Sequence, residues 1–579
     1  MHVRAILALS VLAIGTAHAE APQQPESTIA IAESAAVTSS TFMVSAAHPE
    51  ASRVGQAVLA AGGNAIDAIV AVQFMLNLVE PQSSGIGGGS FLLYWDAAEE
   101  RLWTFDGRET APAAAGPDLF LDPATGEPMA FWDAVVGGRS VGVPGTLKLL
   151  ETVHERFGSR PWAELVEPTI ELAEAGFTVS PRLAGAIAEA IEDDLGRFAA
   201  TREYFLDADG AALAAGSTLA NPAFAATLRQ IAAEGSAPFY TGDLASRIVA
   251  VVTGAEGNAG QMSLDDLAGY EVLTRDPICV DYRRNAVCGM GPPSSGGLTV
   301  GQILGLLGHV DMPGLGYSPT AVHLFLEASR LAFADRALYM ADADFVPMPI
   351  AGLLDPTYLM LRAQALDFDA SMGKARAGNP PWRDARVLAP QDQPEPGGTT
   401  HVSIVDSAGN AVSFTSSIET GFGSRLMVGG FLLNNQLTDF SFRPMAGGRP
   451  VANRVEPGKR PRSSMAPTIV FGPDGEIRLV VGSPGGARII DYVAQTLVGV
   501  LDWGMNIQAA IDLGHFTNLN GDTTLEAASG AEALAGALEA LGHEVKIADQ
   551  NSGLHGIERL PEGWRGGADP RREGIVLGD

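Results

Sequence analysis

The sequence predicts an α+β fold in which stacked sheets are covered by helices. Residues 146–250 and 317–366 are rich in helical patterns, because their apolar residues recur at three- and four-residue spacing. From Thr399 onward the pattern changes to short alternating strands separated by turn residues. Residues 91–95 predict a strand in the first half as well. Both halves therefore supply strands and helices, and such elements bury their apolar faces by packing in layers.

The overall composition is that of a well-packed globular protein. Of the 579 residues, 46% are hydrophobic and only 18% are charged, which argues against disorder. The formal net charge of −30 argues against nucleic acids and anionic membranes as partners, since both repel an acidic protein. An arginine that holds an anionic substrate would stand out against this background.

The first 19 residues have the pattern of a secretory signal peptide. Arg4 supplies the positive charge, residues 5–17 the apolar segment, and Ala17-His18-Ala19 the small-residue cleavage site. The most apolar internal run, residues 69–79, is too short to span a bilayer and predicts a buried helix. We therefore expect a mature chain that begins at residue 20, has no membrane span and is periplasmic or secreted.

The first elements of the chain are two helices and a strand. Residues 54–79 have helical periodicity, and Gly62-Gly63 divides them into two helices. The glycine-rich run at residues 81–90 follows a helix and precedes a strand. A dinucleotide-binding turn has the opposite order, so this run does not predict a nucleotide site.

The second half begins with a hairpin. Residues 401–405 and 410–416 predict two strands, and the intervening Asp406-Ser407-Ala408-Gly409 is favourable for a tight turn. The remaining predicted elements, in chain order, are a strand at 477–481, a helix at 487–503, a helix at 526–541 and a short strand at 545–547.

The two cysteines, Cys279 and Cys288, lie on opposite sides of a predicted tight turn at Arg283-Arg284. In a hairpin closed by this turn they face each other directly, and in an oxidising compartment they could form a cross-strand disulfide. Two free buried thiols are the alternative. A metal site is not expected, because neither the spacing nor nearby histidines fit one.

A Pro- and Gly-rich segment, Pro394-Glu395-Pro396-Gly397-Gly398, stops at Thr399, which opens a strand. If the Gly398–Thr399 bond breaks, Thr399 gains a free α-amine beside its own hydroxyl, so nucleophile and general base lie in one residue. An α-amino group titrates near ~7.7–8.0, which suits this role. An ordinary loop entering an ordinary strand is the alternative. Self-cleavage would divide the mature chain into a large subunit, residues 20–398, and a small catalytic subunit, residues 399–579.

A threonine that attacks an amide needs hydrogen-bond donors for the developing oxyanion. Gly482-Ser483-Pro484-Gly485-Gly486 lies where a predicted strand turns into a helix, so the N–H groups of Gly485 and Gly486 can point at a negative charge. A phosphate-binding loop would require a following Lys-Ser/Thr, which is absent. A plain tight turn is the alternative.

Eight motifs along the chain carry a resemblance to a known family. They are Gly62-Gly63-Asn64-Ala65-Ile66-Asp67-Ala68, Asp106-Gly107-Arg108-Glu109, Val141-Gly142-Val143-Pro144-Gly145, Pro292-Pro293-Ser294-Ser295-Gly296-Gly297, Thr399-Thr400-His401, Leu433-Asn434-Asn435-Gln436-Leu437-Thr438-Asp439-Phe440, Lys459-Arg460-Pro461-Arg462-Ser463-Ser464-Met465 and Gly482-Ser483-Pro484-Gly485-Gly486. The mature chain resembles the γ-glutamyltranspeptidases over nearly its whole length. The resemblance implies an N-terminal-nucleophile hydrolase with an αββα sandwich, matured autocatalytically into two subunits that stay together.

The resemblance also implies roles for individual residues. Thr399 matches the nucleophile, and Gly485 and Gly486 match the oxyanion hole. Arg108 resembles the arginine that holds the substrate α-carboxylate, a role that suits the bidentate guanidinium. The other matching positions are Ser417, which would hydrogen-bond the Thr399 amine or hydroxyl, Ser463 and Ser464, which would assist at the carboxylate, and Asp439, Glu419 and Gln436, which would surround the substrate ammonium.

The chemistry implied by the resemblance is acyl transfer without a metal or organic cofactor. Thr399 Oγ would attack the γ-carbonyl of a γ-glutamyl amide such as glutathione, and the glycine amides would stabilise the oxyanion. Water or an acceptor amine would then release the γ-glutamyl group. The sequence leaves open the balance between hydrolysis and transpeptidation.

The chain departs from some family members in ways that keep three alternatives open. Ser417 and Glu419 replace a threonine and an asparagine of some members, and residues 441–457 form a shorter segment without the tyrosine that covers the pocket. A more open site favours bulkier substrates, and cephalosporin acylases share the architecture, so an acylase is one alternative. A serine hydrolase is another, because Gly138-Arg139-Ser140-Val141-Gly142 fits G-x-S-x-G, although no Asp and His follow in recognisable context. The third is a non-enzymatic periplasmic binding protein.

Overall fold

The computed structural model describes residues 35–383, 387–391 and 398–579. The predicted signal peptide and residues 394–397 of the predicted cleavage segment lie outside these residues. Within the described part, no helix is both long and apolar enough to cross a membrane.

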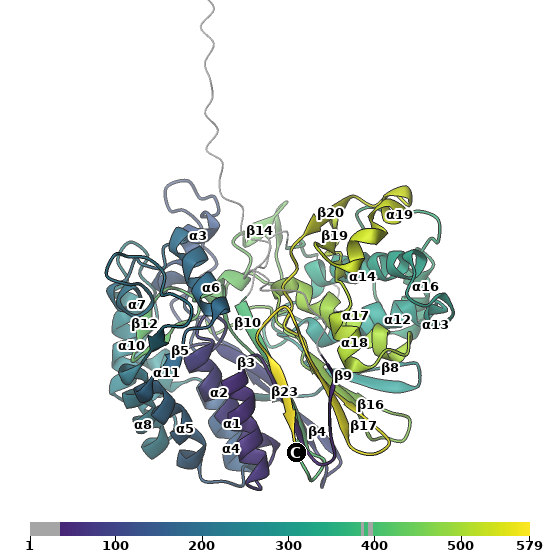
Figure 1. Ribbon diagram of the computed structural model, residues 1–579. Helices are drawn as coiled ribbons and strands as arrows, with labels where there is room; N and C mark the ends of the chain where they lie inside the picture. The colour runs from purple at the N-terminus through teal and green to yellow at the C-terminus, as the bar shows by residue number, and fades with distance from the viewer. Residues whose placement is uncertain (1–34, 384–386, 392–397) are drawn as a thin grey trace, which may run out of the picture.

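Two antiparallel sheets stack face to face at the centre of the described molecule (Figure 1). The strands of the first sheet, in spatial order, are β23 (Ile575–Gly578), β2 (Met43–Ala46), β10 (Gly398–Val405), β11 (Ala411–Glu419), β3 (Gly89–Asp96), β4 (Arg101–Gly107) and β7 (Leu273–Arg275). Those of the second are β1 (Val37–Ser39), β22 (Trp564–Ala568), β21 (His555–Arg559), β17 (Ile477–Gly482), β16 (Thr468–Phe471), β9 (Asn285–Gly289) and β8 (Ile278–Tyr282). Strands β10 and β11 of the first sheet lie against β17 and β21 of the second.

A layer of helices covers the outer face of the first sheet, on the purple and dark blue side of Figure 1. It contains α1 (Pro49–Ala60), α2 (Ala65–Val79), α4 (Thr146–Phe157), α5 (Trp162–Ala175), α6 (Pro181–Glu192), α8 (Pro222–Glu234) and α10 (Asp243–Thr253). Every residue of α2 is buried, which explains its apolar sequence on all faces. Asn64 and Asp67 form a capping box that fixes where α2 begins, directly after Gly62-Gly63 as the sequence predicts.

A second helical layer covers the outer face of the other sheet, on the opposite side of Figure 1. Its main helices are α12 (Gly296–Leu307), α14 (Pro319–Tyr339), α16 (Pro356–Ala363), α17 (Ile489–Leu501) and α18 (Ile507–Asp512). Leu298, Leu324 and Val493 pack with Val480 of β17 in one apolar cluster. Together with the first layer this gives the predicted α+β sandwich of helices, two sheets and helices.

Strand β10 is an interior strand of the first sheet, between β2 and β11. The turn that joins it to β11 is closed by Asp406, whose Oδ1 accepts the N–H groups of Ala408 (2.9 Å) and Asn410 (3.0 Å). This confirms the predicted hairpin. At the other end of β10, Thr399 pairs with Ser417, and an irregularity of register lies between Gly398 and Thr399.

The cysteine hairpin has the register that the sequence predicts. Cys279 of β8 pairs with Cys288 of β9, and both turn residues, Arg283 and Arg284, have positive φ (50° and 68°). Such a turn matches the twist of the flanking strands. The structure joins the two cysteines in a disulfide.

The predicted helix at residues 526–541 is wrong over its first half. Glu526 ends strand β19 (Thr523–Glu526), which lies between β18 (Phe516–Thr517) and β20 (Val545–Ala548), and the α-helix α19 spans only Ala535–Ala540. The Glu526 carboxylate accepts hydrogen bonds from Arg571 Nη2 (2.6 Å) and the His515 N–H (2.8 Å). These tertiary contacts override the helix propensity of the alanine-rich segment.

Candidate active site

One pocket brings the predicted nucleophile together with the predicted substrate-binding residues. It is lined by Arg108, Thr399, Ser417, Glu419, Gln436, Asp439, Ser463, Ser464, Met465, Gly486 and Ile489. Its free volume of about 20 Å³ has room for roughly one water molecule. A substrate must therefore displace contacts that the lining residues make with one another.

Thr399 and Ser417 form a short chain of hydrogen bonds beside the Gly398–Thr399 peptide. Thr399 Oγ1 donates to Ser417 Oγ (3.2 Å), and Ser417 Oγ donates to the carbonyl oxygen of Gly398 (2.6 Å). Ser417 Oγ also accepts the Glu419 N–H (2.9 Å). Ser417 thus links the hydroxyl of Thr399 to the carbonyl of the peptide bond that precedes it.

Arg572, which the sequence analysis missed, holds the other side of Thr399. Its Nη1 donates to the Thr399 carbonyl (2.9 Å), while its Nε donates to Asn551 Oδ1 (2.8 Å) and the Ser552 carbonyl (2.7 Å). The side chain is fully buried, and an ion pair at 3.7 Å connects it to Glu80 at the end of α2. No motif pointed to Arg572, because it lies in sequence far from every strand that carries the pocket.

Arg108 follows β4 and is 1% exposed, so it is not a surface ion pair. Its Nη2 forms an ion pair with Asp439 and donates to the Arg462 carbonyl (3.2 Å), while its Nε donates to the Pro461 carbonyl (3.2 Å). Burial works against the charge of Arg108, but Asp439 and Glu109 raise its pKa. The guanidinium is therefore fixed and charged at the pocket wall.

Glu109 belongs to a motif noted in the sequence but was given no role there, and neither of its oxygens has a hydrogen-bond partner among the described residues. Glu109 Oε2 lies 3.6 Å from Arg108 Nη1. Burial raises the pKa of Glu109 to about 8, against the opposing effect of Arg108. Burial therefore favours the neutral form of this carboxyl, and Asp439 is the acidic residue that pairs directly with Arg108.

Arg460 orients the chain around Arg108. Arg460 Nη1 donates to the Arg108 carbonyl (2.9 Å) and to Asp106 Oδ1 (2.8 Å), and the Arg460 N–H donates to Asp342 Oδ2 (2.9 Å). The motif Lys459-Arg460-Pro461-Arg462 marked this segment in the sequence without assigning Arg460 a role. The structure shows that it braces the loop that presents Arg108.

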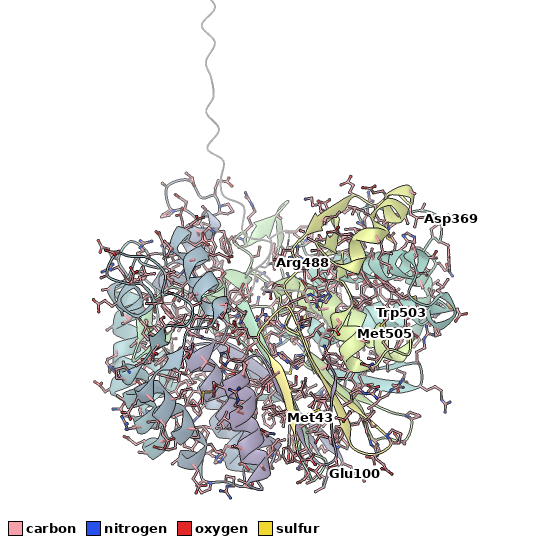
Figure 2. The ribbon with its side chains drawn as sticks, viewed as in Figure 1. Met43, Glu100, Asp369, Arg488, Trp503 and Met505 are labelled. Carbon is pink, nitrogen blue, oxygen red and sulfur yellow. A yellow bond between two sulfur atoms is a disulfide. The ribbon has the colours of Figure 1, made fainter. Side chains whose placement is uncertain are left out.

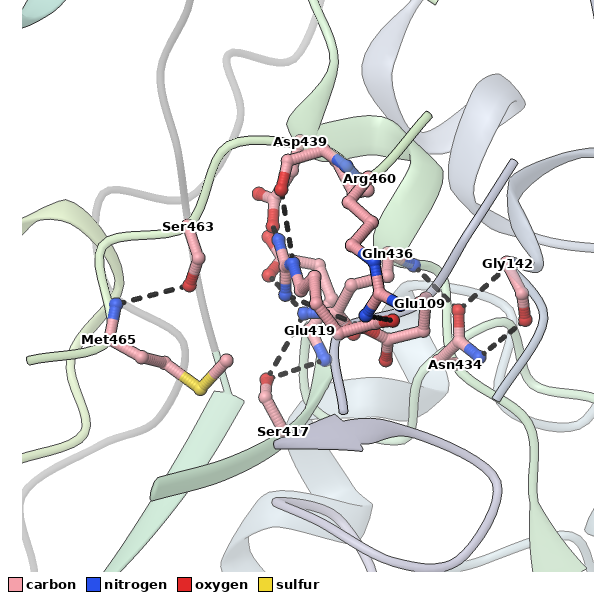
Figure 3. A network of polar contacts seen from close by, with 12 residues as sticks. Glu109, Gly142, Ser417, Glu419, Asn434, Gln436, Asp439, Arg460, Ser463 and Met465 are labelled. Atoms are coloured by element: carbon pink, nitrogen blue, oxygen red, sulfur yellow. Dashed lines mark hydrogen bonds and ion pairs between the residues drawn. The ribbon is translucent and has the colours of Figure 1, made fainter. Parts of the chain in front are cut away.

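Glu419 and Gln436 lie side by side at the wall of the pocket (Figure 3). Gln436 Nε2 lies 3.4 Å from both Glu419 Oε2 and Ser417 Oγ. Asn434 positions this segment, because its Oδ1 accepts the N–H groups of Gly142 and Gln436, both at 3.0 Å. Glu419 has a φ of 80°, a left-handed conformation that is costly for a residue with a side chain and is concentrated at functional sites.

Ser463 and Ser464 are held by residues that precede Thr399 in the chain. Both the N–H (2.8 Å) and the Oγ (2.7 Å) of Ser295 donate to the Ser463 carbonyl, and Arg336 Nη2 donates to Ser464 Oγ (2.6 Å). Ser463 Oγ accepts the Met465 N–H (3.1 Å), a contact visible in Figure 3. The motif at residues 292–297 therefore supports the serine loop.

The predicted oxyanion glycines lie where β17 leads into the turn before α17. Gly485 and Gly486 have φ values of 131° and 58°, both in the region that favours glycine. A Cβ at Gly485 would lie only 2.6 Å from the Tyr492 ring. Gly486 lines the pocket directly, and Gly485 is the residue before it.

Comparison with known proteins agrees with this arrangement. The family model described as gamma-glutamyltranspeptidase matches residues 51–578. The chain belongs to the γ-glutamyltranspeptidase family. It is 39% identical over 550 residues to a glutathione hydrolase proenzyme of Bacillus subtilis strain 168, an alignment that covers 93% of this chain and 91% of the relative.

Solved structures similar to this chain have the same architecture. A cephalosporin acylase from Bacillus halodurans superposes with a TM-score of 0.82 at 26% identity, covering 96% of this chain and 99% of the other. The γ-glutamyltranspeptidase of Helicobacter pylori superposes with a TM-score of 0.53 at 34% identity, covering 58% of this chain and 94% of that chain. The predicted N-terminal-nucleophile hydrolase fold is confirmed.

The serine hydrolase alternative is wrong for this γ-glutamyltranspeptidase family member. Ser140 is fully buried in a 3₁₀ turn, Gly138–Ser140, and its Oγ donates to the carbonyls of Val135 (2.6 Å) and Gly137 (3.1 Å). A nucleophile elbow instead exposes its hydroxyl at a strand-to-helix turn. The glycines around Ser140 therefore serve local packing.

Proposed function

We propose that this chain is a self-cleaving γ-glutamyltransferase and glutathione hydrolase whose nucleophile is Thr399. The observation that carries the proposal is the single pocket in which Thr399 lies with Arg108, Asp439 and the glycine turn. A cationic group, an anionic group and a nucleophile in one pocket suit a zwitterionic amino-acid head whose side-chain amide reaches Thr399. Glutathione and related γ-glutamyl amides have this shape.

Maturation uses the hydrogen bonds around Gly398. Thr399 Oγ1 attacks the Gly398 carbonyl carbon, so an ester bond forms as the Gly398–Thr399 amide bond breaks and the amide nitrogen takes up a proton. Ser417 Oγ supports this step, because it accepts from Thr399 Oγ1 and donates to the carbonyl oxygen where negative charge develops. Hydrolysis of the ester then leaves Thr399 with a free α-amine and a free hydroxyl.

This cleavage yields a large subunit that ends at Gly398 and a small subunit, residues 399–579. The signal peptide, residues 1–19, directs the precursor out of the cytoplasm, so the large subunit begins at residue 20 and the enzyme is periplasmic or secreted. The composition of residues 1–19 supports the export step.

Substrate binding exchanges one ion pair for two. In the free enzyme Arg108 and Asp439 neutralise each other across the pocket. The substrate α-carboxylate pairs with Arg108, beside Ser463 and Ser464. The substrate α-ammonium pairs with Asp439, beside Glu419 and Gln436. The exchange keeps the charges of Arg108 and Asp439 paired, which avoids the desolvation cost of an isolated ion.

Catalysis then proceeds through an acyl-enzyme. The α-amine of Thr399 accepts the hydroxyl proton as Oγ1 attacks the γ-carbonyl, and the N–H groups of Gly485 and Gly486 stabilise the oxyanion. The leaving amine takes the proton as the amide bond breaks. Water or an acceptor amine attacks the ester and restores the free threonine.

The test is release of p-nitroaniline from γ-glutamyl-p-nitroanilide by purified, cleaved protein. We expect turnover that is stimulated by an acceptor dipeptide if transpeptidation contributes. Correctly cleaved protein that releases no p-nitroaniline would refute the proposal and favour a binding protein of the same fold.

The acylase alternative is favoured by one observation, the close superposition on a cephalosporin acylase. Glutaryl amides lack the α-ammonium, so they would leave Asp439 and Glu419 without a cationic partner. Sites built to hydrogen-bond a polar group reject analogues that lack it by about 10⁴–10⁵-fold. We therefore expect γ-glutamyl-p-nitroanilide to be preferred strongly over its glutaryl analogue, and the reverse preference would establish the acylase.

A further inference from the structure

A second cluster of titratable side chains lies outside the active-site pocket. Among the described residues, His323, Glu327 and His543 form a group whose potential metal-ligating atoms all lie within 4.8 Å of one another. His323 and Glu327 are four residues apart on one face of α14, and His543 follows α19. All three are buried. The helices α14 and α19 lie on the same side of Figure 1, where Figure 2 labels Asp369 in the neighbouring loop.

The hydrogen bonds of the two histidines fix how their lone pairs point. His323 Nε2 faces the Asp367 carbonyl at 2.7 Å, so it carries a hydrogen and leaves the lone pair on Nδ1. His323 Nδ1 lies 2.7 Å from His543 Nε2, and His543 Nδ1 lies 2.8 Å from Thr523 Oγ1. In the neutral pair, one hydrogen therefore lies between the two imidazoles, at a position that a cation could take.

Two of the three separations between the ligand atoms are near those of a tetrahedral zinc site. With Zn–N and Zn–O bonds of about 2.0–2.1 Å, neighbouring ligand atoms in a tetrahedron lie about 3.3 Å apart. The two observed separations from His543 Nε2 bracket this value, at 2.7 Å to His323 Nδ1 and 3.8 Å to Glu327 Oε1. Shifts of about half an ångström would bring these two separations to the tetrahedral value, and the third separation is at most 4.8 Å.

The surrounding residues already provide the outer contacts that metal ligands usually have. A ligating histidine commonly donates its other N–H to a carbonyl or hydroxyl oxygen, as His323 does to Asp367 and His543 can to Thr523. Glu327 accepts from the Met372 N–H (2.7 Å) and Ser371 Oγ (2.8 Å), which fix its carboxylate. Arg330 Nε also donates to Glu327 Oε1 (3.0 Å).

We propose that His323, Glu327 and His543 bind one Zn²⁺ ion, with water as the fourth ligand. Two imidazole nitrogens and one carboxylate favour zinc over calcium or magnesium, which prefer oxygen ligands. Binding moves the His543 hydrogen from Nε2 to Nδ1, so both imidazoles stay neutral and no proton is lost.

The position of the ligands gives this ion a structural role, which rests on the proposed cleavage at Gly398–Thr399. His323 and Glu327 precede the cleavage point and His543 follows it. The ion would then be bound by the large subunit through two side chains and by the small subunit through one. It would stabilise their association after the peptide bond between them is broken, without taking part in the chemistry at Thr399.

Zinc binding itself is tested on tag-free Thr399→Ala protein, which does not depend on cleavage. After dialysis against a chelator, the protein is titrated with ZnCl₂ in competition with a chromophoric chelator. We expect one ion per chain, loss of this binding in His543→Gln, and normal binding in His309→Gln, whose histidine is exposed on the same half of the molecule. Replacement by Co²⁺ should give the visible absorption bands of a tetrahedral site. Failure of the parent protein to bind Zn²⁺, or equal binding by His543→Gln, would overturn the proposal.

The link between subunits is tested on cleaved wild-type protein by its urea-induced separation, followed by size-exclusion chromatography. With ZnCl₂ present we expect separation at higher urea concentration than after treatment with a chelator, and no such difference for His543→Gln. Equal midpoints for wild type with and without ZnCl₂ would refute the structural role. A wild type that stays uncut would instead refute the cleavage proposal and leave the titration result standing.

Discussion

The residues before Thr399 and those from Thr399 onward contribute different things to the pocket. The earlier part supplies Arg108 and the groups that brace the serine loop, Ser295 and Arg336. The later part supplies the nucleophile, its partner Ser417 and the acidic residue Asp439. Arg108 and Asp439 form the proposed electrostatic clamp for the two charges of the substrate. In the sequence, the cation Arg108 therefore precedes the proposed cleavage point and the anion Asp439 follows it.

The same division runs through the sheets. In the first sheet β10 and β11 lie between β2 and β3, which come from the earlier part, and in the second sheet β16 pairs with β9. Neither part forms either sheet alone. The pocket exists only after the whole chain has folded, so the proposed cleavage must follow folding, and the two resulting subunits would stay interleaved.

The largest effect is expected from the nucleophile, in the later part. Thr399→Ala should abolish self-cleavage and lower turnover by at least about 10⁴-fold, since no other group supplies the reacting oxygen. Thr399→Ser is the matched control, because it keeps the hydroxyl and should still cleave, more slowly. Gel analysis of cleavage and release of p-nitroaniline measure the two effects. Normal turnover by an uncut Thr399→Ala chain would show that the later part does not supply the nucleophile through Thr399.

The next largest effect is expected from the clamp cation, in the earlier part. Arg108→Ala should raise KM for γ-glutamyl-p-nitroanilide and lower kcat/KM by about 10²–10³-fold, because loss of a buried charged hydrogen-bond partner costs about 3–4 kcal/mol. Arg108→Lys should recover only part of this, since an ammonium does not form the bidentate contact. An unchanged KM in Arg108→Ala would show that the substrate carboxylate binds elsewhere.

Ser417 tests whether a hydroxyl of the later part assists cleavage after Gly398, the last residue of the earlier part. Ser417→Ala should slow cleavage of freshly refolded precursor by about 10²-fold, the usual cost of removing one donor to a developing oxyanion. Ser417→Thr keeps the hydroxyl and should cleave at a rate near that of the wild type. The rate is read from the appearance of residues 399–579 on denaturing gels. Cleavage of Ser417→Ala at the wild-type rate would exclude the proposed hydrogen-bond chain.

Much of the fold was predictable from local sequence. The features that were not predicted depend on contacts between distant segments of the chain. The capped α2, the β10–β11 hairpin and the register of the cysteine hairpin depend on residues close together in the chain. The pocket residues were predicted only through ordered motifs, since nothing local brings Arg108 to Asp439. Arg572 and the strand that ends at Glu526 depend on contacts between distant segments, which no local pattern records.

The smallest effect is expected from Glu109, which lies beside Arg108 in the earlier part and tests how the charge of Arg108 is balanced. Its folded-state pKa of about 8 lies above its ordinary value, so its contribution to stability is complete below pH ~4.5 and is lost as the pH rises toward 8. Glu109→Gln removes this loss. The free energy of unfolding of the variant minus that of the wild type should therefore be larger at pH 8 than at pH 5, by at most a few kcal/mol. Thermal unfolding of both proteins across this range measures it. Parallel pH profiles would mean that Glu109 is ionised in the folded protein.

The most direct test of the central claim is the intact mass of purified mature protein, wild type beside Thr399→Ala. The account predicts two polypeptides in the wild type, one of which has the mass of residues 399–579 with a free amino terminus at Thr399. It predicts a single polypeptide in Thr399→Ala. A single polypeptide in active wild-type protein, or cleavage at another bond, would contradict the assignment of Thr399 as the nucleophile created by self-cleavage.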